Sequence, residues 1–401
     1  MREGKVMADF KDLNALLQGY VDRGLPGCGC VIAKRGEILY ENYFGSADRE
    51  NGVALTANHV FRQASLTKVA LYTTLMMLYE RGRFLMTDPL SEYFPEWREM
   101  KKLVLHPNGT YTIEPTEGPI LLRHVFNMSV GLPYDMIMGD VPVTHPISAE
   151  MAKAMKPLRE RGYYSLRDQI RAVSAVPLTF EPGTRHLYGF SSELAAGLLE
   201  VLEGKSAEMV LKEELFEPLG MTSTANFLCG DLSERLVKNY YLKPGRQLGD
   251  PDALYISNLQ SNGRLGEISG FQRVITNCRD YTKLFQMLAN GGRCGKTRLI
   301  GRKTIDLIRT NLLTPQQINE DFENSYLAGY GYGYGMRTMM NPYVGQHNGS
   351  RGAFGWTGGS GTWGEADPSE GVSIVYMHNL QPNLEEYHHL RMRAVAYGCL
   401  R

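Results

Sequence analysis

Apolar positions near the start of the chain follow a helical period. In residues 9–23 the apolar side chains fall on one face, and Gly24 and Pro26 follow them. This pattern predicts an amphipathic helix that ends before residue 24. Gly29–Lys34 and Glu37–Phe44 are two short β-prone runs joined by Arg35 and Gly36, which predicts a β-hairpin.

The next segments favour helices. Phe61–Tyr79 is apolar nearly all round, which predicts a buried helix that ends at Gly82. From Asp88 to about residue 255 the pattern is helical with long polar loops. The segments that fit helices there are 121–130, 164–174, 190–203 and 206–215, with Pro133, Pro142, Pro146 and Pro157 expected to break up the stretch between them. Helices are also expected at 278–290 and 301–311.

Strand patterns return near the end of the chain. Gly352–Trp363 and Val372–Asn379 are predicted strands, followed by a helix at Leu384–Tyr397, and the glycine-rich run 329–335 is expected to be a strand beside a cleft. Strands at both ends of a helical middle predict an α/β fold. We expect one α/β lobe from residues 1–85 and 256–401, with residues 86–255 inserted as a mainly helical lobe.

Composition excludes several classes of protein. The chain has 401 residues, 43% of them hydrophobic, with 43 basic and 43 acidic side chains. A globular chain of this length can bury a large core, and zero net charge favours neither nucleic acid nor an anionic membrane as a partner. The first residues contain no apolar segment typical of a signal peptide, and no apolar run is long enough to span a bilayer. Scattered cysteines favour free thiols in a reducing compartment, so we expect a cytoplasmic protein.

The strongest chemical signal is Ser65-Leu66-Thr67-Lys68. Residues three apart lie on one face of a helix, so the serine hydroxyl and the lysine amine can meet. We expect Ser65 in the first helical turn, where free N–H groups favour developing negative charge. The apolar residues after Lys68 would desolvate its amine and favour the neutral form, as a base requires. An N-cap serine beside a solvated lysine is the ordinary alternative.

Two further elements follow. Phe180–Tyr188 (FEPGTRHLY) is a turn that delivers a tyrosine ahead of a helix, and Tyr188 can shuttle a proton if a nearby cation stabilises its phenolate. Phe354–Thr362 (FGWTGGSGT) is a glycine-rich strand that a ligand can approach closely. Taken separately, Tyr188 is one of 23 tyrosines and the strand need carry no site.

In this order, the three elements resemble the serine β-lactamase and penicillin-binding-protein superfamily. The likeness favours its class C branch, with family VIII carboxylesterase and acyltransferase relatives. Leu122–Pro133, Phe216–Met221 and Ile275–Tyr281 are similar to other segments of these proteins, so the resemblance spans roughly residues 10–400. It implies a β-lactamase-like fold, in which an antiparallel sheet is flanked by helices and carries an inserted helical lobe.

The resemblance also implies roles. Ser65 would be the acylated nucleophile, Lys68 its base or proton relay, and Tyr188 their partner in activating water. The backbone N–H groups of Ser65 and Gly359 would form the oxyanion hole, where one lost donor typically costs about 10²–10³ in rate. Phe190, Trp356, Thr357 and Gly358 would contact the substrate. No cofactor or metal is expected.

The sequence departs from the β-lactamase pattern at two places. Tyr188-Gly189-Phe190 replaces Tyr-x-Asn, and Trp356-Thr357-Gly358 replaces Lys-Thr-Gly. The missing amide and cation favour esters or small amides over penicillins, although Arg351 leaves the question of a nearby positive charge open. The alternatives are a β-lactamase or D-alanyl-D-alanine carboxypeptidase, and a weakly catalytic acyl-binding sensor. The physiological substrate, the choice between hydrolysis and acyl transfer, and the oligomeric state stay open.

Other candidates are weaker. Asn127–Gly131 is not a G-x-S-x-G elbow, since it lacks the first glycine. The nine histidines include no H-E-x-x-H motif, and a structural hydrogen bond is the favoured role for His124 and His186.

Overall fold

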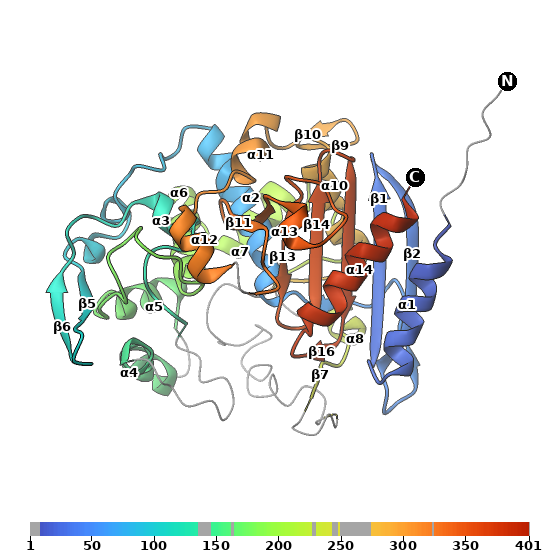
Figure 1. Cartoon of the computed structure of the whole chain (residues 1–401), viewed down its shortest axis with the longest axis horizontal. Coiled ribbons are helices and arrows are strands. Elements are labelled where there is room, and N and C mark those ends of the chain that lie inside the picture. The colour runs from blue at the N-terminus through green and yellow to red at the C-terminus, as the bar shows by residue number, and fades with distance from the viewer. Residues whose placement is uncertain are drawn as a thin grey trace.

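The computed structural model describes residues 9–134, 146–161, 164–226, 230–242, 248, 274–322 and 325–400. Its centre is a fully antiparallel sheet of eight strands in the order β11-β12-β13-β14-β15-β1-β2-β3 (Figure 1). These strands are β1 (Gly27–Lys34), β2 (Glu37–Asp48), β3 (Val53–Ala54), β11 (Tyr330–Tyr332), β12 (Arg337–Met339), β13 (Phe354–Gly358), β14 (Thr362–Asp367) and β15 (Val372–His378). The predicted sheet from both ends of the chain is confirmed.

Alternating side chains give this sheet two buried faces. On one face, Ile32 of β1 and Ile374 of β15 pack against α1 (Lys11–Asp22) and α14 (Glu385–Cys399). On the other face, Val31 and Val375 join the larger core with α2 (Thr67–Glu80) and α10 (Cys278–Ala289). Figure 1 shows α14 crossing in front of the sheet, with α1 at its right-hand edge. The sheet is therefore covered by helices on both faces, as predicted.

The remaining helices cover mainly the left-hand side of Figure 1. They are α3 (Leu122–Phe126), α4 (Pro146–Arg161), α5 (Leu166–Val173), α6 (Ser191–Glu203), α7 (Ala207–Leu211), which continues as a π-helical turn (Lys212–Phe216), α8 (Leu232–Arg235), α11 (Arg302–Ile308), α12 (Pro315–Asp321) and α13 (Pro342–Gly345), with single 3₁₀ turns at Ala64–Leu66, Leu90–Glu92 and Pro95–Trp97. The short strands are β4 (Phe61–Arg62) with β8 (Ile275–Thr276), β5 (Lys101–Leu105) with β6 (Tyr111–Pro115), β7 (Tyr240–Tyr241) with β16 (Leu380–Gln381), and β9 (Arg293–Cys294) with β10 (Thr297–Arg298).

Three predicted elements differ from the structure. The helix expected from Phe61 starts only at Thr67, because Phe61 and Arg62 form β4 and pair with β8 far along the chain. The strand expected over Gly352–Trp363 is two strands, because a turn after Gly358 reverses the chain. The proline-rich stretch before α5 contains α4, in which Pro146 takes the favourable first position and Pro157 is accommodated.

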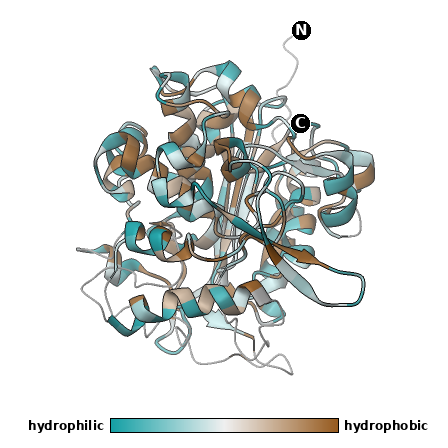
Figure 2. Cartoon of the chain, turned by 90° about the vertical axis from the view of Figure 1, so that its left-hand side faces the viewer, coloured by the Kyte–Doolittle hydropathy of each residue, from teal (hydrophilic) through white to brown (hydrophobic). Residues whose placement is uncertain are grey.

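A β-hairpin was also missed. β5 and β6 pair from Lys101 to Pro115 within the stretch expected to be helical, and Figure 2, which faces this side, shows the hairpin in front of the helices. All five residues of β6 are exposed, so no burial pattern marked it. The lobe boundaries at residues 85/86 and 255/256 stay a prediction, and the second lies outside the described residues.

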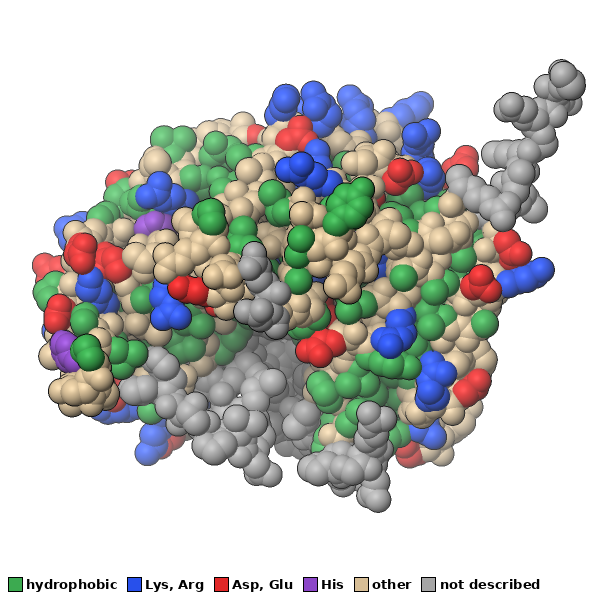
Figure 3. All heavy atoms as spheres, viewed as in Figure 1, with side chains coloured by type: hydrophobic (Ala, Val, Ile, Leu, Met, Phe, Trp, Pro, Cys, Tyr) green, Lys and Arg blue, Asp and Glu red, His purple; other side chains and the backbone are tan. Residues whose placement is uncertain are grey.

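Although the net charge is zero, basic side chains are concentrated along one edge of the molecule. Figure 3 shows Lys and Arg side chains gathered along the upper edge of the molecule, above α11 and the β9–β10 hairpin. The exposed basic residues there are Arg293, Lys296, Arg298, Arg302 and Lys303. This edge contacts the C-terminal end of α2, where Glu80 accepts from the Gly301 N–H at 2.8 Å. Lys68 lies at the other end of α2, about 18 Å from Glu80 at 1.5 Å per residue, and Ser65 lies in the turn just before this helix.

Candidate active site

Ser65 lies in a single 3₁₀ turn that runs directly into α2. Ala64, the first residue of this turn, has a positive φ of 46°. Leu66 and Thr67 are both α-helical, so Ser65 and Lys68 are three residues apart through continuous helical backbone. This geometry places the two side chains on one face of the helix. Ser65 is half-buried, whereas Lys68 has no exposed surface.

The Lys68 amine is enclosed by aromatic rings. Its Nζ lies 4.8 Å from the ring centre of Tyr188 and 5.6 Å from that of Tyr134. Within the described residues Nζ makes no hydrogen bond. Lys68 is therefore a fully buried amine that two tyrosine rings face.

Tyr188 reaches this amine because the segment before α6 is held against residues 128–133. The N–H groups of Leu187 and Phe190 donate to the carbonyl oxygens of Met128 and Leu132 at 2.8 and 3.0 Å. The approach is so close that a Cβ on Gly189 would lie 2.1 Å from the Leu132 oxygen. Only glycine fits between Tyr188 and Phe190, which explains why residue 189 of this motif is glycine.

Trp356 contacts Tyr188 from β13. Its indole Nε1 donates to the Tyr188 hydroxyl over 3.0 Å, and the two ring centres are 5.1 Å apart. The indole also meets Tyr332 edge to face at 5.2 Å, and the Arg337 guanidinium lies 5.7 Å from its ring centre. The residue in place of the β-lactamase lysine thus directs a neutral donor at the tyrosine oxygen.

The end of β13 packs against the backbone just before Ser65. A Cβ on Gly358 would lie 2.1 Å from the carbonyl oxygen of Gln63, and that oxygen accepts from the Thr362 hydroxyl at 3.0 Å. Gly359 follows in the turn to β14, is exposed, and has no atom within 4 Å of the place where a Cβ would stand. The two segments expected to supply the oxyanion-hole N–H groups are therefore in direct contact.

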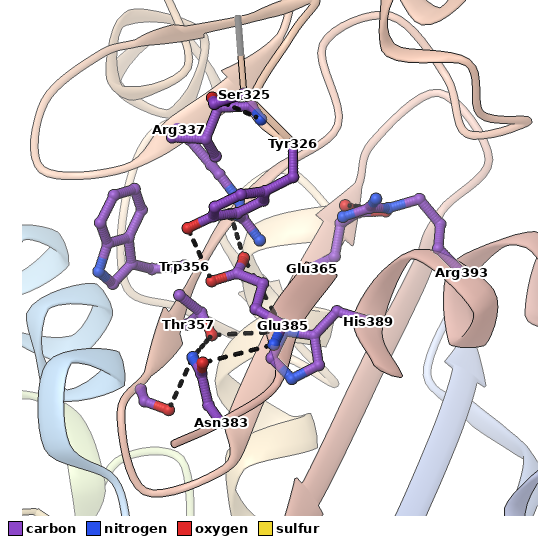
Figure 4. A network of polar contacts seen from close by, with 12 residues as sticks. Ser325, Tyr326, Arg337, Trp356, Thr357, Glu365, Asn383, Glu385, His389 and Arg393 are labelled. Carbon is purple, nitrogen blue, oxygen red and sulfur yellow. Dashed lines mark hydrogen bonds and ion pairs between the residues drawn. The ribbon is translucent and has the colours of Figure 1, made fainter. Parts of the chain in front are cut away.

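A buried polar network lies behind β13 (Figure 4). Glu385, at the start of α14, forms an ion pair with Arg337 and accepts from the Tyr326 hydroxyl at 3.2 Å. Burial by itself would raise the pKa of the Glu385 carboxyl, but the charge of Arg337 and the hydrogen bond from His389 outweigh it and lower that pKa to about 2. On the same face, Thr357 lies 3.4 Å from His389 Nδ1 and accepts from Asn383 at 3.2 Å. Sequence motifs gave no sign of this network.

A second tyrosine in the site was also missed. The Tyr134 hydroxyl lies 3.3 Å from Ser192 Oγ, and Ser192 donates to Glu193 at 2.8 Å. Burial, followed by the charges of Tyr188 and Glu193, raises the pKa of Tyr134 well above its usual range. Tyr134 directly follows the segment Leu122–Pro133, and its place in the chain was the one available signal.

The structure separates other predicted residues from the reacting groups. Phe190 is 2% exposed and packs in the large core. Arg351 lines a surface cavity of about 450 Å³ with Arg309, before the first residue of β13 and at the opposite end of that strand from Gly358. This cavity is lined by Thr338, Met340 and Ser369 and by none of Ser65, Lys68, Tyr188 and Trp356, so Arg351 does not lie at the position of the missing lysine.

Alternative nucleophiles and ligands are disfavoured. Ser129 and Ser360 are at most 1% exposed. His124 accepts from the Leu121 N–H at 3.2 Å, in keeping with a structural role. The Nδ1 atom of His186 lies 3.8 Å from a carboxylate oxygen of Asp321. Across the described ranges, no three His, Cys, Asp or Glu side chains are grouped to hold a metal ion. In the same part of the chain, every helix is too short or too polar to cross a membrane.

An antiparallel sheet covered by helices, with a Ser-x-x-Lys turn leading into a buried helix and a tyrosine against the lysine, defines the serine hydrolases of β-lactamase-like fold. Residues 13–397 match the family model described as Beta-lactamase, so the chain belongs to this family.

Individual relatives support this assignment. An uncharacterized protein of Mycobacterium tuberculosis is 25% identical over 386 residues, or 92% of this chain and 90% of that protein. Esterase EstB of Burkholderia gladioli is 25% identical over 227 residues, or 56% of this chain and 52% of the esterase. The solved structure of EstCE1, described as a hydrolase with promiscuous acyltransferase activity, shares the fold with a TM-score of 0.77 at 20% identity, covering 97% of this chain and 98% of that one.

Proposed function

We propose that this protein is a serine hydrolase that forms an acyl-enzyme on Ser65 and cleaves carboxylic esters or small amides. The proposal rests on the contacts among Lys68, Tyr188 and Trp356. The buried Lys68 amine faces the Tyr188 ring, and the Trp356 indole N–H donates to the Tyr188 hydroxyl. EstB is an esterase and EstCE1 is described as a hydrolase with acyltransferase activity, so both relatives support an acyl-transfer reaction.

The reaction would proceed in two steps. Ser65 Oγ attacks the substrate carbonyl while its proton passes to Lys68 or Tyr188, and the N–H groups of Ser65 and Gly359 stabilise the oxyanion. As the tetrahedral intermediate collapses, Lys68 or Tyr188 gives that proton to the leaving alcohol or amine. Water attacks the acyl-enzyme in the second step, with Tyr188 accepting its proton and Ser65 Oγ regaining one.

The structure favours esters over β-lactams. A β-lactam carboxylate needs a cation or donor when it leaves water, because an unpaired buried charge is costly. Trp356 takes the position of that cation, its N–H is directed at Tyr188, and Arg351 lies beyond the other end of β13. An indole wall instead suits an uncharged acyl chain or an aryl leaving group. The β-lactamase or carboxypeptidase alternative is therefore second to an esterase.

A fluorophosphonate tests the proposal directly. The protein should gain one adduct, mapped to Ser65, and Ser65→Ala should lose both the adduct and ester turnover. Lys68→Ala and Tyr188→Phe should stay folded and lose orders of magnitude in kcat. Ser233→Ala, at an exposed serine on α8, is the matched control and should behave as wild type. An adduct on Ser129 or Ser360 would refute the assignment. Absence of any adduct would favour an acyl-binding sensor.

A further inference from the structure

The start of α14 faces the peptide group that supplies the predicted oxyanion-hole donor. Asn383, two residues before α14, directs its side-chain amide at the end of β13 (Figure 4). Nδ2 donates to Thr357 Oγ1 at 3.2 Å and to the carbonyl oxygen of Gly358 at 3.4 Å. The Gly361 N–H donates to the same carbonyl at 3.0 Å. The Gly358 oxygen is therefore held by two donors from different parts of the chain.

Holding this oxygen sets the direction of the Gly359 N–H. The carbonyl of Gly358 and the N–H of Gly359 belong to one planar peptide group, in which the two bonds point in opposite directions. Fixing the oxygen toward Asn383 consequently fixes the N–H away from it. Hydrogen bonds to a peptide carbonyl also polarise its N–H and make it a stronger donor. Glycines at 358, 359 and 361 leave this peptide free to rotate unless something holds it.

We propose that Asn383 is a positioning residue that orients the Gly359 N–H for the tetrahedral oxyanion. The inference rests on the proposed function, since it assigns a task within the same site. Asn383 acts through the Gly358 carbonyl and does not itself touch the substrate in this assignment.

The buried network behind β13 keeps Asn383 in place. Asn383 Oδ1 accepts from the Glu385 N–H at 3.4 Å, and Leu384 between them has a positive φ of 47°. A non-glycine residue holds such a conformation only where its surroundings impose it. The ion pair of Glu385 with Arg337 supplies that constraint, because both side chains are at most 5% exposed. The ion pair therefore holds the start of α14 in place. Asn383, two residues before this helix, is held with it.

Replacing the amide tests the inference. Asn383→Leu keeps the volume and removes the donor. Asn383→Asp keeps the acceptor for the Glu385 N–H and also removes the donor, so it serves if the leucine variant folds poorly. Losing an oxyanion donor outright costs about 10²–10³ in kcat, and misorienting one should cost about tenfold or more. KM for a p-nitrophenyl ester should change little, because the loss falls on the transition state.

A boronic acid separates this role from a merely structural one. Its adduct with a serine hydroxyl places a tetrahedral oxygen where the oxyanion would form, so its affinity should fall by the same factor as kcat/KM in both variants. Asn348→Leu is the matched control, since Asn348 donates to the Ala394 carbonyl of α14 at 2.8 Å, on the exposed outer side of the helix. It should retain wild-type kcat and boronate affinity.

The outcomes are distinguishable. A folded Asn383→Asp protein with kcat within twofold of wild type would overturn the inference alone, as would a fall in kcat with unchanged boronate affinity. A wild-type protein without a phosphonate adduct on Ser65 would overturn both the inference and the proposed function.

Discussion

The indole N–H of Trp356 donates to the hydroxyl oxygen of Tyr188 over 3.0 Å. The same hydroxyl belongs to the ring that faces the Lys68 amine at 4.8 Å. A neutral donor thus stands where the β-lactamase pattern has a lysine cation. The contact gives the Tyr188 oxygen a neutral donor, and it leads to the first two predictions.

Trp356→Phe should keep the ring and lose the donor. A hydrogen bond contributes about 0.5–1.5 kcal/mol, so we expect kcat for a p-nitrophenyl ester to fall by about 2- to 10-fold. Tyr332→Phe is the control, since it keeps the ring packed on the other side of Trp356. An unchanged kcat in Trp356→Phe would contradict this role.

Substrate preference should follow the same residue. Short-chain p-nitrophenyl esters should have far higher kcat/KM than nitrocefin or benzylpenicillin, after each value is divided by the uncatalysed rate. Burying an uncharged acyl chain gains about 25 cal/mol per Å², whereas the guanidinium beside Trp356, that of Arg337, is buried and already paired with Glu385. Trp356→Lys should shift the corrected ratio toward the β-lactams. If the wild-type protein prefers β-lactams after the correction, the esterase proposal fails.

Two adjacent glycines should respond differently to alanine. Gly358→Ala would place a Cβ 2.1 Å from the Gln63 oxygen and 2.3 Å from Thr362 Oγ1, so β13 must move away from the Ser65 turn. Overpacking of this kind costs about 1–3 kcal/mol, which thermal unfolding would detect. Gly359→Ala meets no atom within 4 Å and should melt as wild type does. Equal melting temperatures for the two variants would show that the contact with Gln63 is loose.

Acid should destabilise the fold through buried histidines. Burial, reinforced by the charges of His389, Arg23 and Arg391, lowers the pKa of His388 from 6.5 to about 3. In acid the unfolded chain therefore binds a proton at His388 that the folded chain does not bind. The contribution of neutral His388 to the free energy of unfolding is complete above about pH 6.5 and is lost as the pH falls toward 3. Between these pH values, each such histidine adds about 1.4 kcal/mol per pH unit to the slope of the free energy of unfolding against pH.

Urea unfolding between pH 7 and 4.5 measures that slope. His388→Asn should reduce that slope by one proton. Equal slopes for wild type and His388→Asn would mean that His388 is not held neutral.

Local motifs predicted the residues whose chemistry depends on near neighbours in the chain. Ser65 and Lys68 share one helical turn, and Tyr188 follows its own turn, so each was visible in a short segment. Asn383, Glu385 and Arg337 were not visible. Arg337 acquires its place only when β12 pairs with β13, and Asn383 acquires its role only when α14 packs behind Gly358. The start of α2 was misplaced for the same reason, since β4 exists only through its pairing with β8.

The pairing of β1 with β15 sets the order in which this protein can be completed during synthesis. Cys28 stands opposite His378, and Lys34 opposite Val372, so the middle of the sheet joins early and late parts of the chain. A ribosome must release β15 before β1 gains its second neighbour, and contacts this distant in sequence form slowly. Until then the apolar strand β1 has an open edge, which is prone to aggregate. The nascent chain is therefore a candidate for chaperone binding through most of its translation.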